Sequence, residues 1–291
     1  MTPDRILAAI DPKNVEFALH DVATGSVSAT EKVPVGRHST FSEALLRYAD
    51  RQQLNLYGMR LYVAVAGAVE RDVIRVTNGR WHVSRSGLFA MTGQEVTFLN
   101  DVSAIAHAIL DGHTTRLFAI GHPRTEESDG CSIVVFADRG LGAAAIHRKS
   151  TTFVTTSEAG HAEYSPLTLV EANIARFIRS NGRVTFEEMM VALRRNGFLL
   201  RPVTTPEDDE TMLANLLGRY CAMVALTFSA WNGIYLCGAA VPILSKQSMR
   251  DAFCRGFLND GAMRTRLREI PLAIVEQRNA IMRGLAAFSS R

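Results

Sequence analysis

The sequence predicts an α/β protein with a duplicated core, and three observations support this prediction. Apolar runs rich in strand-forming residues alternate with stretches whose apolar residues recur at helical spacing. Two segments each open with a glycine-turned hairpin, at residues 23–26 and 140–142, and continue into helices and strands. The chain has 291 residues and 47% hydrophobic content, enough for one large domain or two smaller ones with cores of their own. We expect a ligand in the cleft between the two repeated units.

The first part of the chain is rich in strands. Its predicted strands are apolar runs of strand-forming residues at 6–10, 15–20, 27–33, 61–66 and 96–99. Residues 41–53 instead place apolar side chains on one helical face, and Ser39 or Thr40 could cap that helix. Residues 102–110 form a second predicted helix. This part, residues 1–110 together with a C-terminal helix at 279–291, is the predicted small domain.

The second part, residues 111–278, is the predicted large domain. Its predicted strands are 131–137, 143–147, 234–237 and 272–275. Its predicted helices are 167–179, 185–195 and 208–228, and a last helix at 279–287 returns to the small domain. Residues 220–245 contain no charged side chain and are long enough to span a bilayer. Because Ser229, Asn232 and Gly233 interrupt this stretch, we predict a buried helix, a turn and a buried strand, and no membrane partner.

Charge and cysteine usage limit the class of protein. The formal charge is +3, from 32 basic and 29 acidic residues, which is too balanced for nucleic acid as the main partner. The four cysteines form no C-x-x-C pair, so neither a zinc site nor a disulfide framework is predicted. We therefore expect reduced thiols in a cytoplasmic protein without a metal site built from its own side chains.

Three short polar stretches far apart in the chain carry the reagents for holding a sugar and deprotonating one of its hydroxyls. They are Asn100-Asp101, Glu158-Ala159-Gly160-His161 and Glu187. Each sugar hydroxyl is both a donor and an acceptor, and amides and carboxylates around it satisfy both roles. A carboxylate within reach of the attacking hydroxyl can accept its proton.

Each of these signals also has a structural explanation. Asn100-Asp101 favours a helix cap before Val102. Glu158 and His161 are also typical of loop residues, and Glu187 in a first helical turn suits the helix dipole. The glycines at 140 and 142 are consistent with a simple hairpin turn. From the residues alone, both interpretations stay open.

The motifs FLNDVSAIAHAI, RGLGAAAI, EAGHAEYSP and YLCGAAVP follow one another along the chain. In this order they resemble the bacterial glucokinase family, and the resemblance covers nearly the whole chain. It implies two ribonuclease-H-like domains of the actin/hexokinase type with an inter-domain cleft. It also implies a homodimer.

On the sugar side the resemblance implies specific roles. Asp101 matches the catalytic base, and the implied sugar-binding residues are Asn100, Asp101, Glu158, His161 and Glu187. The family's E-G-G-H has one glycine replaced, by Ala159. The match around Glu187 ends early, because Val191-Ala192 stand where the family has Ser-Gly.

On the donor side the chain departs from the family. In the first phosphate motif Ala9 replaces an Asp that helps to hold Mg²⁺, and Asp11 and Pro12 replace two glycines. Glycine lets backbone N–H groups approach phosphate, whereas proline has no N–H to offer. In the second motif Asp138 replaces a glycine. The implied ligands of ATP are Lys13, Asn14, Arg139, Gly140, Gly142 and Gly238.

Three functional hypotheses follow. The first is a glucokinase-type hexose kinase that transfers the γ-phosphate of ATP to the 6-hydroxyl of glucose, with Mg²⁺ and with Asp101 as general base. The alternative is a catalytically weak or inactive kinase-like protein that binds glucose or a related hexose and regulates a partner. A sugar-responsive repressor is a third class, but the sequence shows neither its helix-turn-helix nor its cysteine-rich zinc motif.

Overall fold

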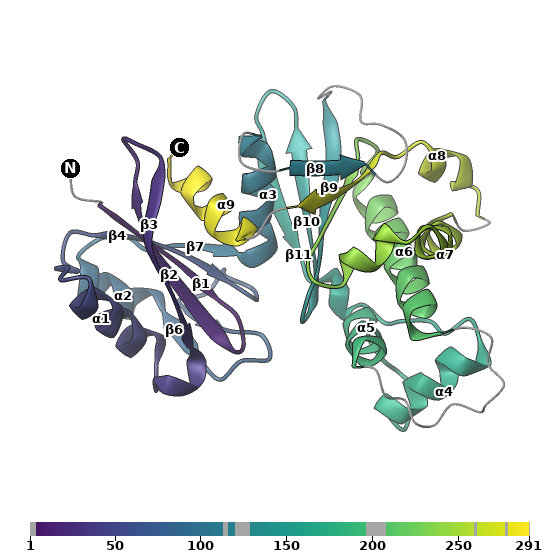
Figure 1. Ribbon diagram of the computed structural model, residues 1–291, viewed down its shortest axis with the longest axis horizontal. Coiled ribbons are helices and arrows are strands. Elements are labelled where there is room, and N and C mark those ends of the chain that lie inside the picture. Colours follow the sequence, from purple (N-terminus) through teal and green to yellow (C-terminus); the bar gives the residue numbers. More distant parts are fainter. Residues whose placement is uncertain are drawn as a thin grey trace. The chain divides into compact units, whose positions relative to one another are not determined.

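The computed structural model describes residues 4–112, 116–119, 129–195, 208–258, 261–276 and 279–290. Its chain divides into two compact units. Unit 1 comprises Met1–Thr115 and Gln277–Arg291, and unit 2 comprises Arg116–Glu276. Each unit is an α/β layer structure around its own sheet (Figure 1).

Unit 1 is built on a five-stranded sheet in the order β3-β2-β1-β4-β7. These strands are β1 (Arg5–Ile10), β2 (Asn14–Asp21), β3 (Ser26–Pro34), β4 (Arg60–Val65) and β7 (Thr97–Asn100). The first three form an antiparallel meander, while β1, β4 and β7 run parallel. All five predicted strands are thereby confirmed. Because β1, β4 and β7 are parallel, the segments that follow them leave the sheet at one edge.

Helices cover both faces of this sheet (Figure 1). They are α1 (Phe41–Arg51), α2 (Arg85–Thr92), α3 (Asp101–Asp111) and α9 (Ala280–Ser289). Alternate residues of β1 explain the sandwich: Ile6 and Ala8 belong to the core that includes α1 and α2, whereas Leu7 packs in a smaller core with α3 and α9. The Thr40 side chain accepts a hydrogen bond from the Glu43 N–H at 3.1 Å, which confirms the predicted cap of α1.

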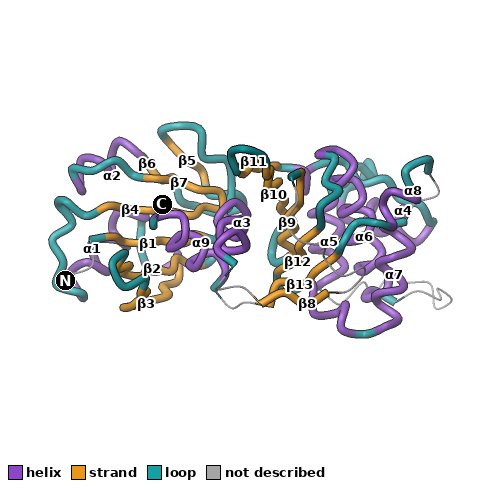
Figure 2. Tube along the Cα trace, turned by 90° about the horizontal axis from the view of Figure 1, so that it is seen from above, coloured by secondary structure: helices purple, strands orange, loops and turns teal. Residues whose placement is uncertain are grey.

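Unit 2 is built on a six-stranded sheet in the order β11-β10-β9-β12-β13-β8. These strands are β8 (Arg116–Ala119), β9 (Gly130–Ala137), β10 (Leu141–Arg148), β11 (Phe153–Ser157), β12 (Ile234–Cys237) and β13 (Leu272–Glu276). Its helices are α4 (Leu169–Ile178), α5 (Phe186–Arg194), α6 (Asp209–Phe228), α7 (Gln247–Phe257) and α8 (Arg264–Arg268). In Figure 2, α5, α6 and α7 lie on one side of the strands, and their apolar residues share one core with β9, β10 and β12.

The hairpin between β9 and β10 differs from the prediction. The expected turn at 140–142 is displaced, because Leu141 and Gly142 already pair with Ala137 and Phe136 in the sheet. Leu141 is buried in the core of unit 2, and this burial draws it into the strand. The turn therefore comprises Asp138, Arg139 and Gly140, closed by a bond from the Asp138 N–H to the Gly140 carbonyl at 3.0 Å.

The uncharged stretch at 220–245 forms a helix, a turn and a strand, as predicted. Helix α6 ends at Phe228, Ser229 adopts a left-handed conformation with φ of 51°, and β12 begins at Ile234. By length and hydropathy alone α6 could cross a membrane, but 61% of its apolar window is buried inside the protein. This burial is the property of a core helix.

Several elements escaped the sequence analysis. They are α2, α7, α8, β8, β11 and the two-stranded ribbon of β5 (Val73–Arg75) and β6 (His82–Ser84). The apolar positions of α7 do follow helical spacing, with Met249, Ala252, Phe253 and Phe257 buried. The strands of the ribbon have three residues each, too few to show a period.

A buried histidine links β2 to the C-terminal helix α9 within unit 1. The His20 Nδ1 lies 2.8 Å from the Ser289 Oγ, and burial followed by the nearby Arg5 charge lowers the His20 pKa below its usual 6.5. The folded state therefore prefers neutral His20, and the unfolded chain binds the extra proton as the pH falls below 6.5. The contribution of neutral His20 to the free energy of unfolding is complete above pH 6.5 and is lost as the pH falls below that value.

We predict that the free energy of unfolding of the native chain falls between pH 7 and pH 5. Replacing His20 with glutamine should flatten this dependence, since glutamine does not titrate. Urea unfolding at both pH values measures the difference. An unchanged pH slope in the variant would show that other groups cause the loss.

Candidate active site

Asn100 ends β7 and caps α3, the first helix of the predicted sugar site. Its Oδ1 accepts hydrogen bonds from the Val102 N–H at 2.9 Å and the Ser103 N–H at 3.3 Å, and its Nδ2 donates to the Gly67 carbonyl at 3.2 Å. The side chain is 6% exposed. The cap interpretation is thus confirmed, and the same bonds hold the Asn100 amide in one orientation. Its nitrogen carries two hydrogens, so a sugar hydroxyl could accept the second.

Asp101 is the first residue of α3. Its Oδ1 accepts a hydrogen bond from the Val102 N–H at 2.9 Å, and the side chain is partly exposed. A carboxylate at a helix N-terminus is stabilised by the helix dipole. The ionised form is the one that a general base needs.

The turn at residues 11–14 follows β1 at the same edge of the unit 1 sheet. The last paired residues of the parallel strands, Ile10, Val65 and Asn100, lie side by side in register. Ligands of α/β sheets bind beyond the carboxyl ends of parallel strands. Unit 1 therefore places the first phosphate motif and the Asn100-Asp101 pair at one edge.

Backbone N–H groups of that turn donate hydrogen bonds to the side chain of Asp11, which belongs to the same turn. The Asp11 Oδ1 accepts the Lys13 N–H at 2.6 Å and the Asn14 N–H at 2.9 Å, while the Asp11 N–H donates to the Asn14 carbonyl at 2.9 Å. In a phosphate loop, such successive N–H groups bind phosphate oxygens. Here the Asp11 carboxylate takes that place, because it stands where the family has a glycine.

In unit 2, the Glu158–His161 motif packs directly on the start of β10. Glu158 follows β11, and residues 159–161 form the short helix η2 (Ala159–His161). A Cβ built on Gly160 would lie 1.7 Å from the Leu141 carbonyl oxygen, so only glycine fits this position. Ala159 instead packs against the core, which explains why the other glycine of the motif is replaceable. The His161 Nε2 and the Glu158 Oε2 are 3.7 Å apart, and both side chains are exposed.

Glu187 reaches the same residue of β10 from the first turn of α5. Its Oε2 accepts a hydrogen bond from the Leu141 N–H at 2.9 Å. The backbone before α5 also pairs with the segment after η2, since the Tyr164 N–H donates to the Val184 carbonyl at 2.8 Å and the Phe186 N–H to the Ala162 carbonyl at 3.1 Å. Leu141 is therefore the point at which the Glu158–His161 motif, Glu187 and the second phosphate motif meet.

The remaining retained glycine, Gly238, joins this cluster from β12. It has φ of +104°, and a Cβ there would lie 2.3 Å from the Ala137 carbonyl oxygen. That carbonyl accepts the Ala240 N–H at 2.9 Å. Because β9 and β12 are parallel neighbours, the residues that follow both strands lie at one edge. The start of β10 pairs with the end of β9, so Gly140, Gly142 and the Arg139 turn lie at the same edge of the unit 2 sheet as Gly238.

Two residues near this cluster were missed by the sequence analysis. Arg194, at the end of α5, donates a hydrogen bond to the Asp138 carbonyl. Tyr220 of α6 is fully buried, and its hydroxyl has no hydrogen-bond partner among the residues that the structure describes. Burial, with smaller contributions from Cys221, Glu158 and Glu187, raises the Tyr220 pKa and keeps the phenol neutral. Neither residue belongs to a recognisable motif, so only its tertiary neighbours indicate it.

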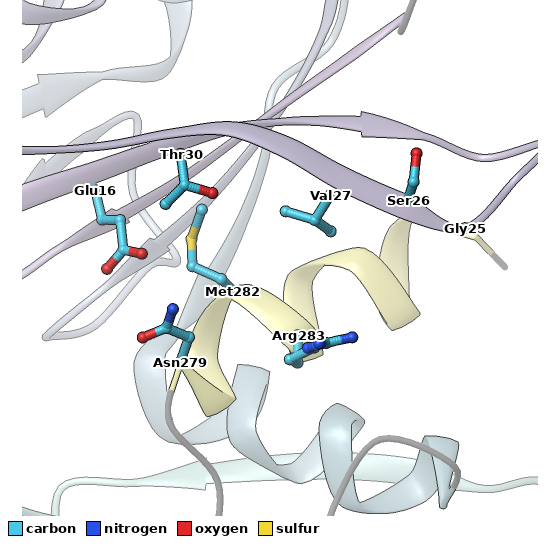
Figure 3. Close-up of a pocket in the computed structure, with 8 residues that line it drawn as sticks. All are labelled: Glu16, Gly25, Ser26, Val27, Thr30, Asn279, Met282 and Arg283. Carbon is cyan, nitrogen blue, oxygen red and sulfur yellow. The ribbon is translucent and has the colours of Figure 1, made fainter.

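A cavity of about 430 Å³ lies elsewhere in unit 1, between β2, β3 and α9 (Figure 3). Glu16 and Asn279 lie towards one end, Arg283 lies towards the other, and Met282 lies between them. None of the predicted site residues lines it. It is therefore separate from the candidate site.

Two solved glucokinases share the fold of this chain. Glucokinase from an Antarctic psychrotroph aligns with a TM-score of 0.71 and 21% identity, covering 99% of this chain and 98% of that one. Glucokinase from Balamuthia mandrillaris, solved with glucose, aligns with a TM-score of 0.78 and 15% identity over 99% and 93% of the two chains. These alignments confirm the actin/hexokinase-type fold.

Sequence comparison identifies the family. The family description Glucokinase matches residues 6–192 and 209–291. The glucokinase of Brucella abortus (strain 2308) is 30% identical over 282 residues, covering 87% of this chain and 81% of that protein. The chain therefore belongs to the glucokinase family, as its motifs predicted.

Proposed function

We propose that this protein is a glucokinase that transfers the γ-phosphate of ATP to the 6-hydroxyl of glucose. The observation that carries the proposal is the meeting of motifs at Leu141, beside the family membership of the chain. The first residue of β10, Leu141, contacts both the Glu158–His161 motif and Glu187. The turn that precedes β10 belongs to the second phosphate motif. A sugar hydroxyl and a phosphate could therefore be held a few residues apart.

The proposed roles divide between the units. Asp101 takes the proton of the 6-hydroxyl as it attacks phosphorus, and Asn100 donates its second amide hydrogen to a sugar hydroxyl. Glu158, His161 and Glu187 bind the other hydroxyls. From family membership we also propose a cytoplasmic homodimer.

The donor is ATP in this proposal. Gly140, Gly142 and Gly238 fit a nucleotide, because they lie at the edge of the unit 2 sheet where the parallel strands β9 and β12 end. Among the described residues, no group of three or more His, Cys, Asp or Glu side chains could hold a metal ion by itself. This suits Mg²⁺ held mainly by the phosphates, where it would neutralise their charge.

The test is a coupled assay. The purified chain is incubated with glucose and MgATP, and glucose 6-phosphate is detected as it forms. Turnover above that of an Asp101→Ala control supports the proposal, and turnover equal to that control contradicts it. Parallel assays with other hexoses define the preferred acceptor.

A weak or inactive sugar-binding protein is the second candidate, and the Asp11 contacts favour it. Thermal shift separates the two. A glucose-binding regulator should be stabilised by glucose alone and not by MgATP. The kinase should be stabilised by each ligand.

Asp11 offers a direct prediction about the donor. Replacing Asp11 with glycine removes a negative charge and frees the Lys13 and Asn14 N–H groups for phosphate. We expect the KM for ATP to fall by about tenfold, the equivalent of one charge-assisted hydrogen bond. Initial rates at varied ATP measure it.

Asp21 provides the matched control, because its Oδ1 accepts the Ala23 N–H at 2.9 Å and the Thr24 N–H at 3.3 Å at the other end of β2. Asp21→Gly should leave the KM for ATP unchanged. If both variants change the KM for ATP equally, the effect comes from removing any Asp that closes a turn of β2. Release of the Lys13 and Asn14 N–H groups would then not be its cause.

A further inference from the structure

We infer that helix α5 sets the geometry of the donor-side turn at residues 138–141, and that Arg194 is a positioning residue for the nucleotide phosphates. The inference rests on the proposed function, because it assumes that this turn faces ATP. It adds a residue that lies outside every motif of the chain. It also gives Glu187 a second task besides binding sugar.

Two side chains of α5 hold the two ends of the turn. Glu187 accepts the Leu141 N–H at 2.9 Å where β10 begins, and the Arg194 guanidinium donates to the Asp138 carbonyl where β9 ends. Residues seven apart on an α-helix are close to two full turns apart, so both side chains leave the same face of α5. One helix face therefore spans the turn from end to end.

The backbone of the turn and of the adjoining strands adds bonds of its own. The turn's own backbone supplies one bond, from the Asp138 N–H to the Gly140 carbonyl, and the sheet pairs Ala137 with Leu141. The family motif has glycine where this chain has Asp138, so the chain has lost a residue that lets the backbone approach phosphate closely. A cation bonded to the Asp138 carbonyl fixes that peptide and adds positive charge beside the proposed phosphate position.

Helix α5, which carries Glu187 and Arg194, is itself held in place by its cap and by the core. A capping box joins the side chain and backbone of Thr185 to those of Glu188, and Met189, Met190 and Leu193 are buried in the core of unit 2. The helix begins just after the backbone pairing with the segment that follows η2. Sugar contacts at Glu187 and phosphate contacts at the turn are therefore coupled through one rigid element.

The experiment compares Arg194→Met with Arg195→Met in the full chain. Arg195 is the exposed residue that follows Arg194 at the end of the same helix. Arg195→Met therefore removes the same charge as Arg194→Met. Calorimetry measures binding of a non-hydrolysable ATP analogue with Mg²⁺, and separately of glucose. We expect Arg194→Met to weaken analogue binding by about tenfold, the loss of one charge-assisted hydrogen bond. Glucose binding should change less than about twofold, and Arg195→Met should behave as the native chain.

Further variants make the outcome decisive. Arg194→Lys should recover part of the analogue affinity, because lysine keeps the charge and one donor, and it replaces Arg194→Met if that variant does not fold. Glu187→Gln should weaken both ligands. The inference is overturned if Arg194→Met and Arg195→Met bind the analogue equally, if Arg194→Met weakens glucose and analogue alike, or if the native chain binds no analogue. Absence of turnover with intact analogue binding would instead contradict only the proposed function.

Discussion

Replacing Asp101 with asparagine should lower kcat by about 10²–10⁴-fold, the usual contribution of a general base. Asparagine has nearly the same shape but cannot accept the proton of the attacking hydroxyl. Its Oδ1 can still accept the Val102 N–H, so the start of α3 should stay intact. Steady-state kinetics with saturating glucose and MgATP measure the loss.

The comparison must separate chemistry from folding. The melting temperature of Asp101→Asn should stay within a few degrees of the native value, and glucose should still bind by calorimetry. Asn100→Ala provides the contrast, because it removes a helix cap and should cost about 1–2 kcal/mol of stability. A kcat for Asp101→Asn within about threefold of the native value would remove Asp101 from the role of base.

Gly160→Ala should destabilise unit 2 by about 3 kcal/mol, because the new methyl group has no space. Its Cβ would lie 1.7 Å from a backbone carbonyl oxygen, which cannot rotate away as a side chain can. The melting temperature should fall by roughly 6–12 °C for a unit of this size. A backbone shift that removes this clash must move Glu158 and His161 away from β10, so glucose affinity should fall as well.

The neighbouring position gives the control for this prediction. Ala159→Gly restores the residue of the family motif and removes only a methyl group, so we expect at most about 1 kcal/mol of destabilisation and unchanged glucose affinity. Thermal unfolding and glucose calorimetry compare the two variants. If Gly160→Ala melts and binds glucose as the native chain does, the proposed packing of η2 on Leu141 is wrong.

The contact at Leu141 also gives a physical reason for the pattern of retained and lost glycines. Gly160 and Gly238 each lie against a backbone carbonyl at a distance that excludes a Cβ. Ala159 packs against the core. Asp138 lies in the turn between β9 and β10, and its carbonyl accepts a hydrogen bond from Arg194. Close backbone approach thus accounts for the retention of Gly160 and Gly238.

Local pattern was enough to predict most of the secondary structure. Strand formers in short apolar runs indicated the five strands of the unit 1 sheet and β9, β10, β12 and β13 of unit 2, and the caps Thr40 and Asn100 marked helix starts. The stretch at 220–245 was correctly interpreted as helix, turn and strand because its breakers lie at the turn. These features depend on residues a few positions apart, which is the range over which sequence carries direct information.

The sequence by itself determined the α/β class, the order of elements, the family and the list of polar residues proposed for the site. Only the tertiary structure decided that the Asp11 carboxylate binds the N–H groups of its own turn, and that Leu141 joins two motifs and belongs to a strand. It also revealed Arg194, whose partner lies 56 residues away in the chain. Such contacts depend on which backbones the folded core brings together, and no local spacing encodes them.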